Sequence, residues 1–356
     1  MNMTTSTLPP HVKRGVLGVG DPRRKLIGRA VVGMLMTAAA FVIFAWITKQ
    51  ITWLYVHSPW GEDPYDAVVS FTFFFVPLVA GLCLVRLSLF RSDEPQPVER
   101  MVDLLRGSRV ALAAVLITLA ADWASVLLRT DQASWSASTA ILVALLALMT
   151  VVTVVATVVL RRAPDERLPG SRRATPATDW FADVVMVADQ ASRHIGILGP
   201  VARRAIRWTD QHAVSAVRRH PMSAAAVAAL GFGAAMAASV SIEEGVGPVL
   251  ALFFVVGASG MFAFFVVAGS YLGLVRGSPP PVGVRRRLID AAVISSASVP
   301  VALAFRASLW GVVGSTDASA GLGTLAWLLT TVAVGVFVLI LVTESLAGIH
   351  KTGNAS

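Results

Sequence analysis

The sequence has few of the residues from which enzymes build reactive or metal-binding sites. It contains a single cysteine, Cys83, which excludes an intrachain disulfide and a thiolate metal cluster. All six histidines fall outside the apolar segments, and the chain has neither the H-E-x-x-H pattern of zinc proteases nor a glycine-rich phosphate loop that ends in lysine. We predict no catalytic residue and no cofactor, leave metal binding open, and favour a protein that is not an enzyme.

Charged residues are scarce as well. They make up 14% of the chain and hydrophobic residues make up 55%, whereas soluble domains carry about 25% charged residues. The apolar residues gather into runs of about 20, the length of a helix that crosses about 30 Å of hydrocarbon. The eight runs cover residues 28–48, 67–88, 109–128, 137–160, 222–242, 247–272, 289–309 and 324–346. The sequence therefore predicts an all-α integral membrane protein with about eight transmembrane helices.

The positive charges divide unequally between the two sides of these helices. If the runs cross the membrane alternately, 27 of the 30 lysine and arginine residues fall on one side, which we call the basic side. Loops rich in lysine and arginine stay in the cytoplasm, so we expect both termini to be cytoplasmic. Arginine far outnumbers lysine, as is typical of GC-rich bacterial genomes. We therefore expect the bacterial plasma membrane, with anionic lipids rather than nucleic acid beside the basic side.

The chain is predicted to contain two similar halves. Matching residues recur at offsets of 177 to 179 between the first four runs and the last four. Because each set has an even number of helices, the sets would be parallel four-helix repeats. The matching pairs are Phe74 and Phe253, Gly81 and Gly260, Arg109 and Arg286, and Arg129 and Arg306. The predicted segments are a tail over 1–27, a first half over 28–160, a linker over 161–220, a second half over 221–347 and a tail over 348–356.

The linker, residues 161–220, is the longest polar segment between runs. Trp180, Val184 and Val187 recur at helical spacing with Asp183 off this stripe, which predicts an amphipathic helix. A second, arginine-rich helix follows it. Such helices lie in the membrane interface or dock a cytoplasmic protein. We expect the interface and keep a cytoplasmic partner protein as the alternative.

Asp122 is the one carboxylate well inside a predicted run. A charge at the centre of a membrane costs roughly 2.5–3.5 kcal/mol on insertion scales, so it needs a function or a partner. We predict an intramembrane polar site made of Asp122, Arg306 and Arg129. Two interpretations stay open: a structural ion pair of Asp122 with one of these arginines, and a site for a proton or a cation.

The side opposite the basic side carries a group of carboxylates. Glu62, Asp63 and Asp66 lie between the first two runs, and Glu243 and Glu244 occupy the equivalent loop of the second half. Such oxygens are suited to a hard cation. The alternative is a polar turn in which Asp63 or Asp66 caps the next helix.

The adjacent pair Glu62 and Asp63 resembles the acidic pair in the first outer loop of polyprenyl-phosphate-dependent membrane glycosyltransferases. The resemblance is limited to these two residues, because the loop is short and no large outer domain follows. It implies an enzyme whose carboxylates assist sugar transfer. From the architecture we instead expect a transporter or permease-like component, with a membrane-bound regulator or scaffold that acts through 161–220 as the alternative and the glycosyltransferase third.

Overall fold

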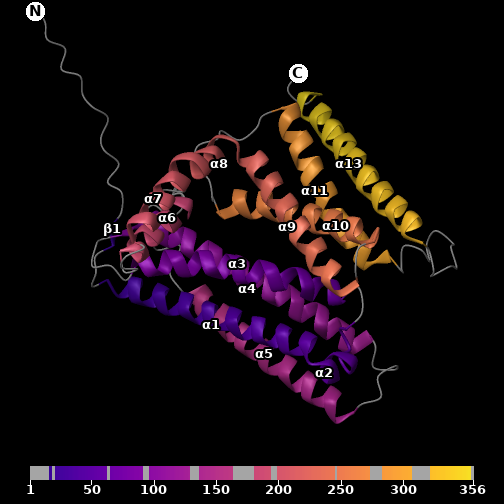
Figure 1. Ribbon diagram of the computed structural model, residues 1–356, viewed down its shortest axis with the longest axis horizontal. Coiled ribbons are helices and arrows are strands. Elements are labelled where there is room, and N and C mark those ends of the chain that lie inside the picture. Colours follow the sequence, from indigo (N-terminus) through magenta and orange to yellow (C-terminus); the bar gives the residue numbers. More distant parts are fainter. Residues whose placement is uncertain are drawn as a thin grey trace, which may run out of the picture.

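The computed structural model is almost entirely helical in the part of the chain that it describes (Figure 1). It describes residues 16–17, 21–61, 65–90, 96–128, 136–162, 180–193, 199–244, 247–272, 283–306 and 321–353. The helices are α1 (Pro22–Gln50), α2 (Thr52–Val56), α3 (Tyr65–Phe90), α4 (Val98–Leu128), α5 (Ala137–Arg162), α6 (Trp180–Ser192), α7 (Gly199–Thr209), the π-helical turn η3 (Asp210–Val214), α8 (Ser215–Arg219), α9 (Pro221–Glu244), α10 (Val249–Leu272), α11 (Val284–Ala304) and α13 (Leu322–Gly353). Two-residue strands β1 (Val16–Leu17) and β2 (Gln96–Pro97) pair antiparallel.

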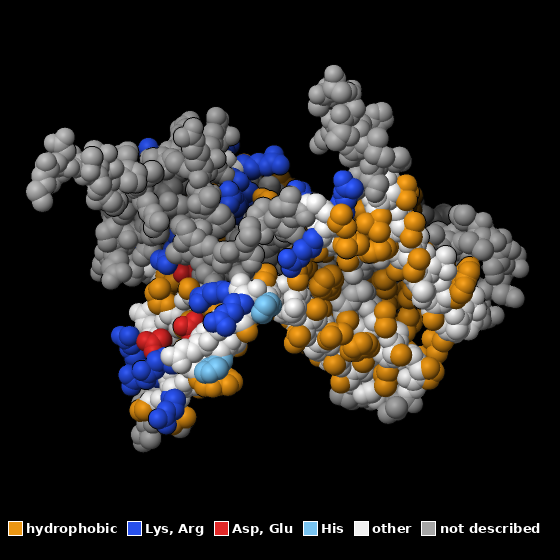
Figure 2. All heavy atoms as spheres, turned by 90° about the horizontal axis from the view of Figure 1, so that it is seen from above, with side chains coloured by type: hydrophobic (Ala, Val, Ile, Leu, Met, Phe, Trp, Pro, Cys, Tyr) orange, Lys and Arg blue, Asp and Glu red, His pale blue; other side chains and the backbone are white. Residues whose placement is uncertain are grey.

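Eight of the described helices are long and apolar enough to cross a bilayer, namely α1, α3, α4, α5, α9, α10, α11 and α13. Their outward positions are apolar: Met36 of α1 is 68% exposed and Val267 of α10 is 60% exposed. Figure 2 shows hydrophobic side chains over a broad flank of the molecule, with the visible lysine and arginine side chains at its edge and beyond it. Apolar surface of this extent needs lipid or protein against it. The prediction of an all-α polytopic membrane protein is confirmed.

The four spans of the first half close into a bundle. Helix α1 packs against α3, α4 and α5, while α4 also packs against α3 and α5. Met34 and Phe41 of α1 are fully buried in its core, as are Leu142 and Leu146 of α5. Each pair is spaced so that both side chains lie on one face of their helix, and the two faces meet in the bundle.

The four spans of the second half form a row. Helix α9 packs on α10, α10 on α11 and α11 on α13, but α9 and α13 share no extended contact within the described residues. Helices α9 and α10 approach closely at Gly233, where an added Cβ would lie 2.6 Å from the carbonyl oxygen of Phe254. The contacts between consecutive spans thus recur in both halves, but the closing contact between α1 and α5 does not. The parallel repeat stays a prediction.

Aromatic side chains join the two halves. Phe75 of α3 stacks on Phe264 of α10, with ring centroids 4.0 Å apart and an angle of 7° between the ring planes. Phe74 meets Phe232 of α9 edge-on, with centroids 5.1 Å apart. Gly260 of α10 leaves room for Phe71, and an added Cβ there would lie 2.9 Å from its ring. This part of the contact between the halves is therefore apolar.

Helix α4 extends further on the basic side than the sequence predicts. It begins at Val98, whereas the predicted run begins at residue 109. Arg100 and Arg106, expected in a loop, and Asp103 therefore lie on the first turns of the helix. Buried charges need partners close by, and these come from α3 and from α6, which packs on α3.

Candidate functional site

The first candidate site surrounds Asp122 in α4. Its side chain is fully buried, and neither carboxylate oxygen has a hydrogen-bond partner among the described residues. Asp122 lies six residues before the end of α4 at Leu128, which is about 9 Å along the helix axis at about 1.5 Å per residue. Burying an ionised carboxylate without a partner is costly, so this residue needs a reason to be where it is.

Two charged residues on neighbouring helices act on Asp122 electrostatically, Lys49 and Asp66. Lys49 in the last turn of α1 forms an ion pair of 2.8 Å with Asp66 in the first turn of α3, and it also donates to the hydroxyl of Ser70. A cation at a helix C-terminus and an anion at a helix N-terminus are both favoured by the helix dipoles. We call Asp122, Lys49, Asp66 and Ser70 the Asp122 site.

The polar residues next to Asp122 on α4 have partners of their own. Thr118, one turn before it, shares a hydrogen bond of 2.7 Å with Thr72 of α3. The indole of Trp123 donates to the hydroxyl of Thr150 in α5 at 2.9 Å. These bonds fix the rotation of α4 against α3 and α5, and so they fix the position of Asp122.

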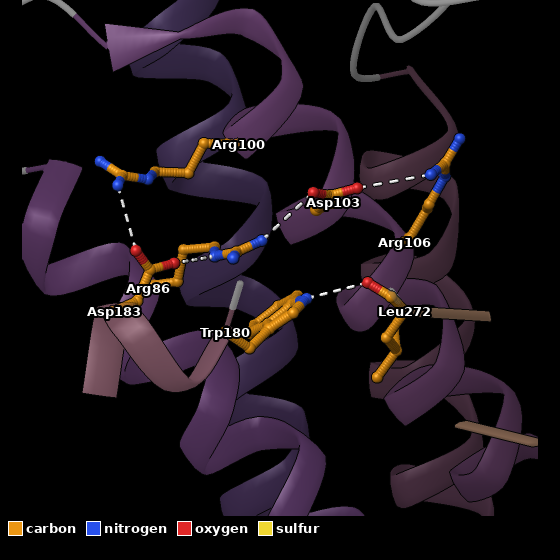
Figure 3. A network of polar contacts seen from close by, with 7 residues as sticks. All are labelled: Arg86, Arg100, Asp103, Arg106, Trp180, Asp183 and Leu272. Carbon is orange, nitrogen blue, oxygen red and sulfur yellow. Dashed lines mark hydrogen bonds and ion pairs between the residues drawn. The ribbon is translucent and has the colours of Figure 1, made fainter. Parts of the chain in front are cut away.

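The second candidate site is a buried ion network at the basic side of the first half (Figure 3). Nε of Arg86 in α3 donates to Asp183 of α6 at 2.6 Å, and Nη1 lies 3.5 Å from Asp103 of α4. Arg100 lies 3.1 Å from the other oxygen of Asp183, and Arg106 lies 3.4 Å from Asp103. We call these five residues the Arg86 network. It holds the basic ends of α3, α4 and α6 together.

Trp180 extends the Arg86 network to the second half. The guanidinium carbon of Arg86 lies 3.7 Å from the centroid of the Trp180 ring, a cation–π contact. The indole N–H donates to the carbonyl of Leu272, the last residue of α10, at 2.9 Å. The ring also packs on Gly107 of α4, where an added Cβ would lie 3.2 Å from it. Helix α6 therefore bridges α3 and α4 of the first half to α10 of the second (Figure 3).

The burial of α6 differs from what the linker sequence predicts. We expected Asp183 to lie off the buried stripe of an interfacial helix, but the structure buries it together with Trp180. Periodicity alone places an acidic residue on the solvent side. The partner that reverses this preference, Arg86, lies 97 residues away in the sequence.

The structure brings only some of the predicted site residues together. The ion pair between Asp122 and Arg306 is not formed, because Arg306 lies just beyond α11 and donates to the carbonyl of Leu303 at 3.1 Å. Asp66 joins Asp122 instead, as part of the Asp122 site. The predicted site residues outside the described part of the chain are Arg129, Glu62 and Asp63, together with the side chains of Glu243 and Glu244 at the end of α9.

The residues of these sites that the sequence did not predict as site residues include Lys49, Arg86 and Asp103. Two of them carried a usable signal. Arg86 lies inside the predicted run 67–88, where a charge needs a partner. Lys49 is one of three cations on the side opposite the basic side, so its presence there already called for a nearby anion. Asp103 carried no such signal, because it lies outside the predicted runs.

The two sites differ in what they can do chemically. In the Arg86 network each carboxylate has arginine partners, so the network is suited to holding helices together. In the Asp122 site two carboxylates face one lysine, which leaves one negative charge to be balanced. The described residues contain no group of three or more histidine, cysteine or acidic residues that could hold a metal ion.

Comparison of the chain with protein-family models, with curated proteins and with solved structures finds no match. Relatives therefore supply no function for either site. The charge imbalance at Asp122 and the bridging position of α6 are the features from which a function can be inferred.

Proposed function

We propose that the chain is a transporter or permease-like component of the bacterial plasma membrane, in which Asp122 is the polar group that the transported ion or solute meets. The observation that carries the proposal is a fully buried carboxylate in a membrane-spanning helix with no hydrogen-bond partner among the described residues. Ionisable residues inside spans are costly and typically mark ion or substrate pathways. If Asp122 were only one member of a structural ion pair, a cation would lie beside it and balance its charge.

A pathway through the first half fits the Asp122 site better than a pathway between the halves. The charged residues that act on Asp122 belong to α1 and α3. The contact of α3 with α9 and α10 is lined by phenylalanine side chains, which offer a polar solute no hydrogen-bond donor or acceptor. With the basic side in the cytoplasm, the Asp122 site lies nearer the external side of the membrane.

A flux experiment tests this proposal. The purified chain is reconstituted into liposomes that contain a pH-sensitive dye, and isotope-labelled ions, amino acids, sugars and nucleosides are supplied under an imposed pH gradient or membrane potential. We expect the wild type to move protons or one of these species faster than protein-free liposomes. Asp122→Asn should lose most of that rate, because the amide keeps the shape of the carboxylate but not its charge.

The matched control is Asp290→Asn in the second half. Asp290 is half-exposed and forms an ion pair of 3.5 Å with Arg286, outside the Asp122 site. This variant should keep the wild-type rate. No flux of any supplied species above the protein-free level would reject a transporter, and equal losses in both variants would remove Asp122 from the pathway.

The second candidate function is a membrane-bound scaffold that recruits a cytoplasmic protein through residues 161–220. The observation in its favour is the exposure of Val201 and Trp208 on α7, at 67% and 61%, beside the exposed Arg204 and Arg207. Anionic lipid headgroups fit the same combination of apolar and basic side chains. The flux experiment separates the two functions, because a scaffold carries no ion or solute.

A further inference from the structure

The Asp122 site lacks one positive charge among its described residues. Lys49 is paired with Asp66 at 2.8 Å, which leaves the Asp122 carboxylate unbalanced. The other helices that pack on α4 bring no second cation to it. Helix α10 has no charged residue, and the only ones of α5, Arg161 and Arg162, lie at its basic end. The remaining charged residues of α3 and α4 belong to their basic ends, as do those of α1 before Lys49.

A proton fits the missing charge better than a metal ion does. A neutral carboxylic acid tolerates a site with no exposure and no hydrogen-bond partner far better than a carboxylate does. A metal ion at Asp122 would be repelled by the Lys49 ammonium nearby, whereas a neutral acid would not. Hard cations also prefer several oxygen ligands, and no cluster of acidic side chains among the described residues supplies them.

We infer that Asp122 is a proton-binding site and that Lys49 is its counter-cation, moving from Asp66 to Asp122 when the proton leaves. In this step the O–H bond of the acid breaks, the proton passes to water, and its electron pair stays on the carboxylate. The Lys49 ammonium then balances Asp122, and Asp66 remains at the N-terminus of α3, where the helix dipole favours an anion. The inference rests on the proposed function in one respect, that the proton is the transported or driving ion.

The proton exchanges at the end of the bundle that carries Lys49 and Asp66. Their side chains are 27% and 28% exposed, whereas the Asp122 side chain has no exposure. Toward the basic side, the buried face of α4 continues with Thr118, Val115 and Ala111. Valine and alanine side chains carry no group that accepts or donates a proton. At Val115 and Ala111 the described face of α4 therefore offers no proton-transfer group toward the basic side, whereas the partly exposed Lys49 and Asp66 lie at the other end.

Infrared spectroscopy of the full chain in lipid nanodiscs tests the inference, because a carboxylic acid and a carboxylate absorb at different frequencies. The wild type should show an acid carbonyl band at neutral pH that Asp122→Asn lacks and Asp290→Asn keeps. Raising the pH should convert this band to carboxylate. Lys49→Gln should move the midpoint upward by about one pH unit or more, because the counter-cation is gone. Asp66→Asn should move the midpoint downward, because this variant removes an anion and leaves Lys49 free to pair with Asp122.

The opposite shifts of Lys49→Gln and Asp66→Asn keep the inference testable even if Asp122→Asn does not fold. Absence of a titrating acid band, or shifts of both variants in one direction, would overturn it. Loss of the band on adding sodium or potassium at constant pH would assign the site to a metal cation and also overturn it. A titrating band without flux would support the proton site and reject the transport function. Flux without a titrating band would support transport and reject the proton site.

Discussion

The two halves of the chain have the same number of spans but are built differently. In the first half α1 touches all three of the other spans, and the most apolar stretch of α1 has 44% of its residues buried in the protein. In the second half the spans form a row, and the corresponding stretches of α9 and α13 have 11% buried. The first half therefore holds its helices by mutual contact, while the outer helices of the second half turn most of their apolar surface to lipid or to another protein.

Polar groups follow the same division. The Arg86 network and the Asp122 site both lie in the closed bundle or against it. In the open row, the described ion pair between Arg286 and Asp290 is exposed, with side-chain exposures of 68% and 43%. Buried charges need fixed partners, which a closed bundle offers and a row does not. We therefore expect substitutions of charged residues to separate the two halves most clearly.

The largest effect is expected at Arg86. Arg86→Met removes the cation that Asp183 and Asp103 share, and breaking a buried pair in this way costs about 3–5 kcal/mol. The comparison variant in the second half, Arg286→Met, removes an exposed pair worth about 0–1 kcal/mol. The measurement is the free energy of unfolding in mixed micelles of lipid and denaturing detergent. Similar losses in the two variants would contradict the distinction between the halves.

The spans could be predicted from the sequence because the hydrophobic signal is strong and local. Eight runs of about 20 apolar residues correspond to the eight long helices, and their order follows directly. The start of α4 at Val98 could not be predicted in the same way. Arg100 and Arg106 are typical of a loop, and they are helical here because Asp183 and Asp103 balance them. Packing outweighs the local signal at this position.

The candidate sites were predictable only in part, for the same reason. Asp122 is visible in the sequence, because a carboxylate inside an apolar run is rare. That Lys49 and Asp66 are its neighbours follows from how α1 and α3 pack against α4, and hydropathy does not predict this packing. The predicted partner Arg306 belongs to the other half, and it contacts the carbonyl of Leu303 instead. Tertiary packing decides which charged residues lie beside Asp122, so the sign of a charge and the order of the spans were not sufficient to predict them.

An effect of intermediate size is expected between α9 and α10, where the open row is locally tight. Gly233→Ala would place a Cβ 2.6 Å from a carbonyl oxygen of α10 and 2.9 Å from Ala258. Overpacking of this kind costs about 1–3 kcal/mol. Gly231→Ala on the same helix has nothing within 4 Å and should gain up to about 1 kcal/mol from helix propensity. If both variants changed the free energy of unfolding in the same direction, the contact between α9 and α10 at Gly233 would not be tightly packed.

The smallest effect is expected at Trp180, which links the halves. Trp180→Phe keeps an aromatic ring over Arg86 but removes the bond to the Leu272 carbonyl, a loss of about 0.5–1.5 kcal/mol. The control Trp123→Phe loses an equivalent bond to Thr150 inside the first half. Spin labels at the exposed Leu148 of α5 and Leu339 of α13 report the separation of the halves. Trp180→Phe should broaden their distance distribution in pulsed electron paramagnetic resonance, and Trp123→Phe should not. If both variants broaden it equally, α6 is not the link, and the aromatic contacts of α3 with α9 and α10 hold the halves together instead.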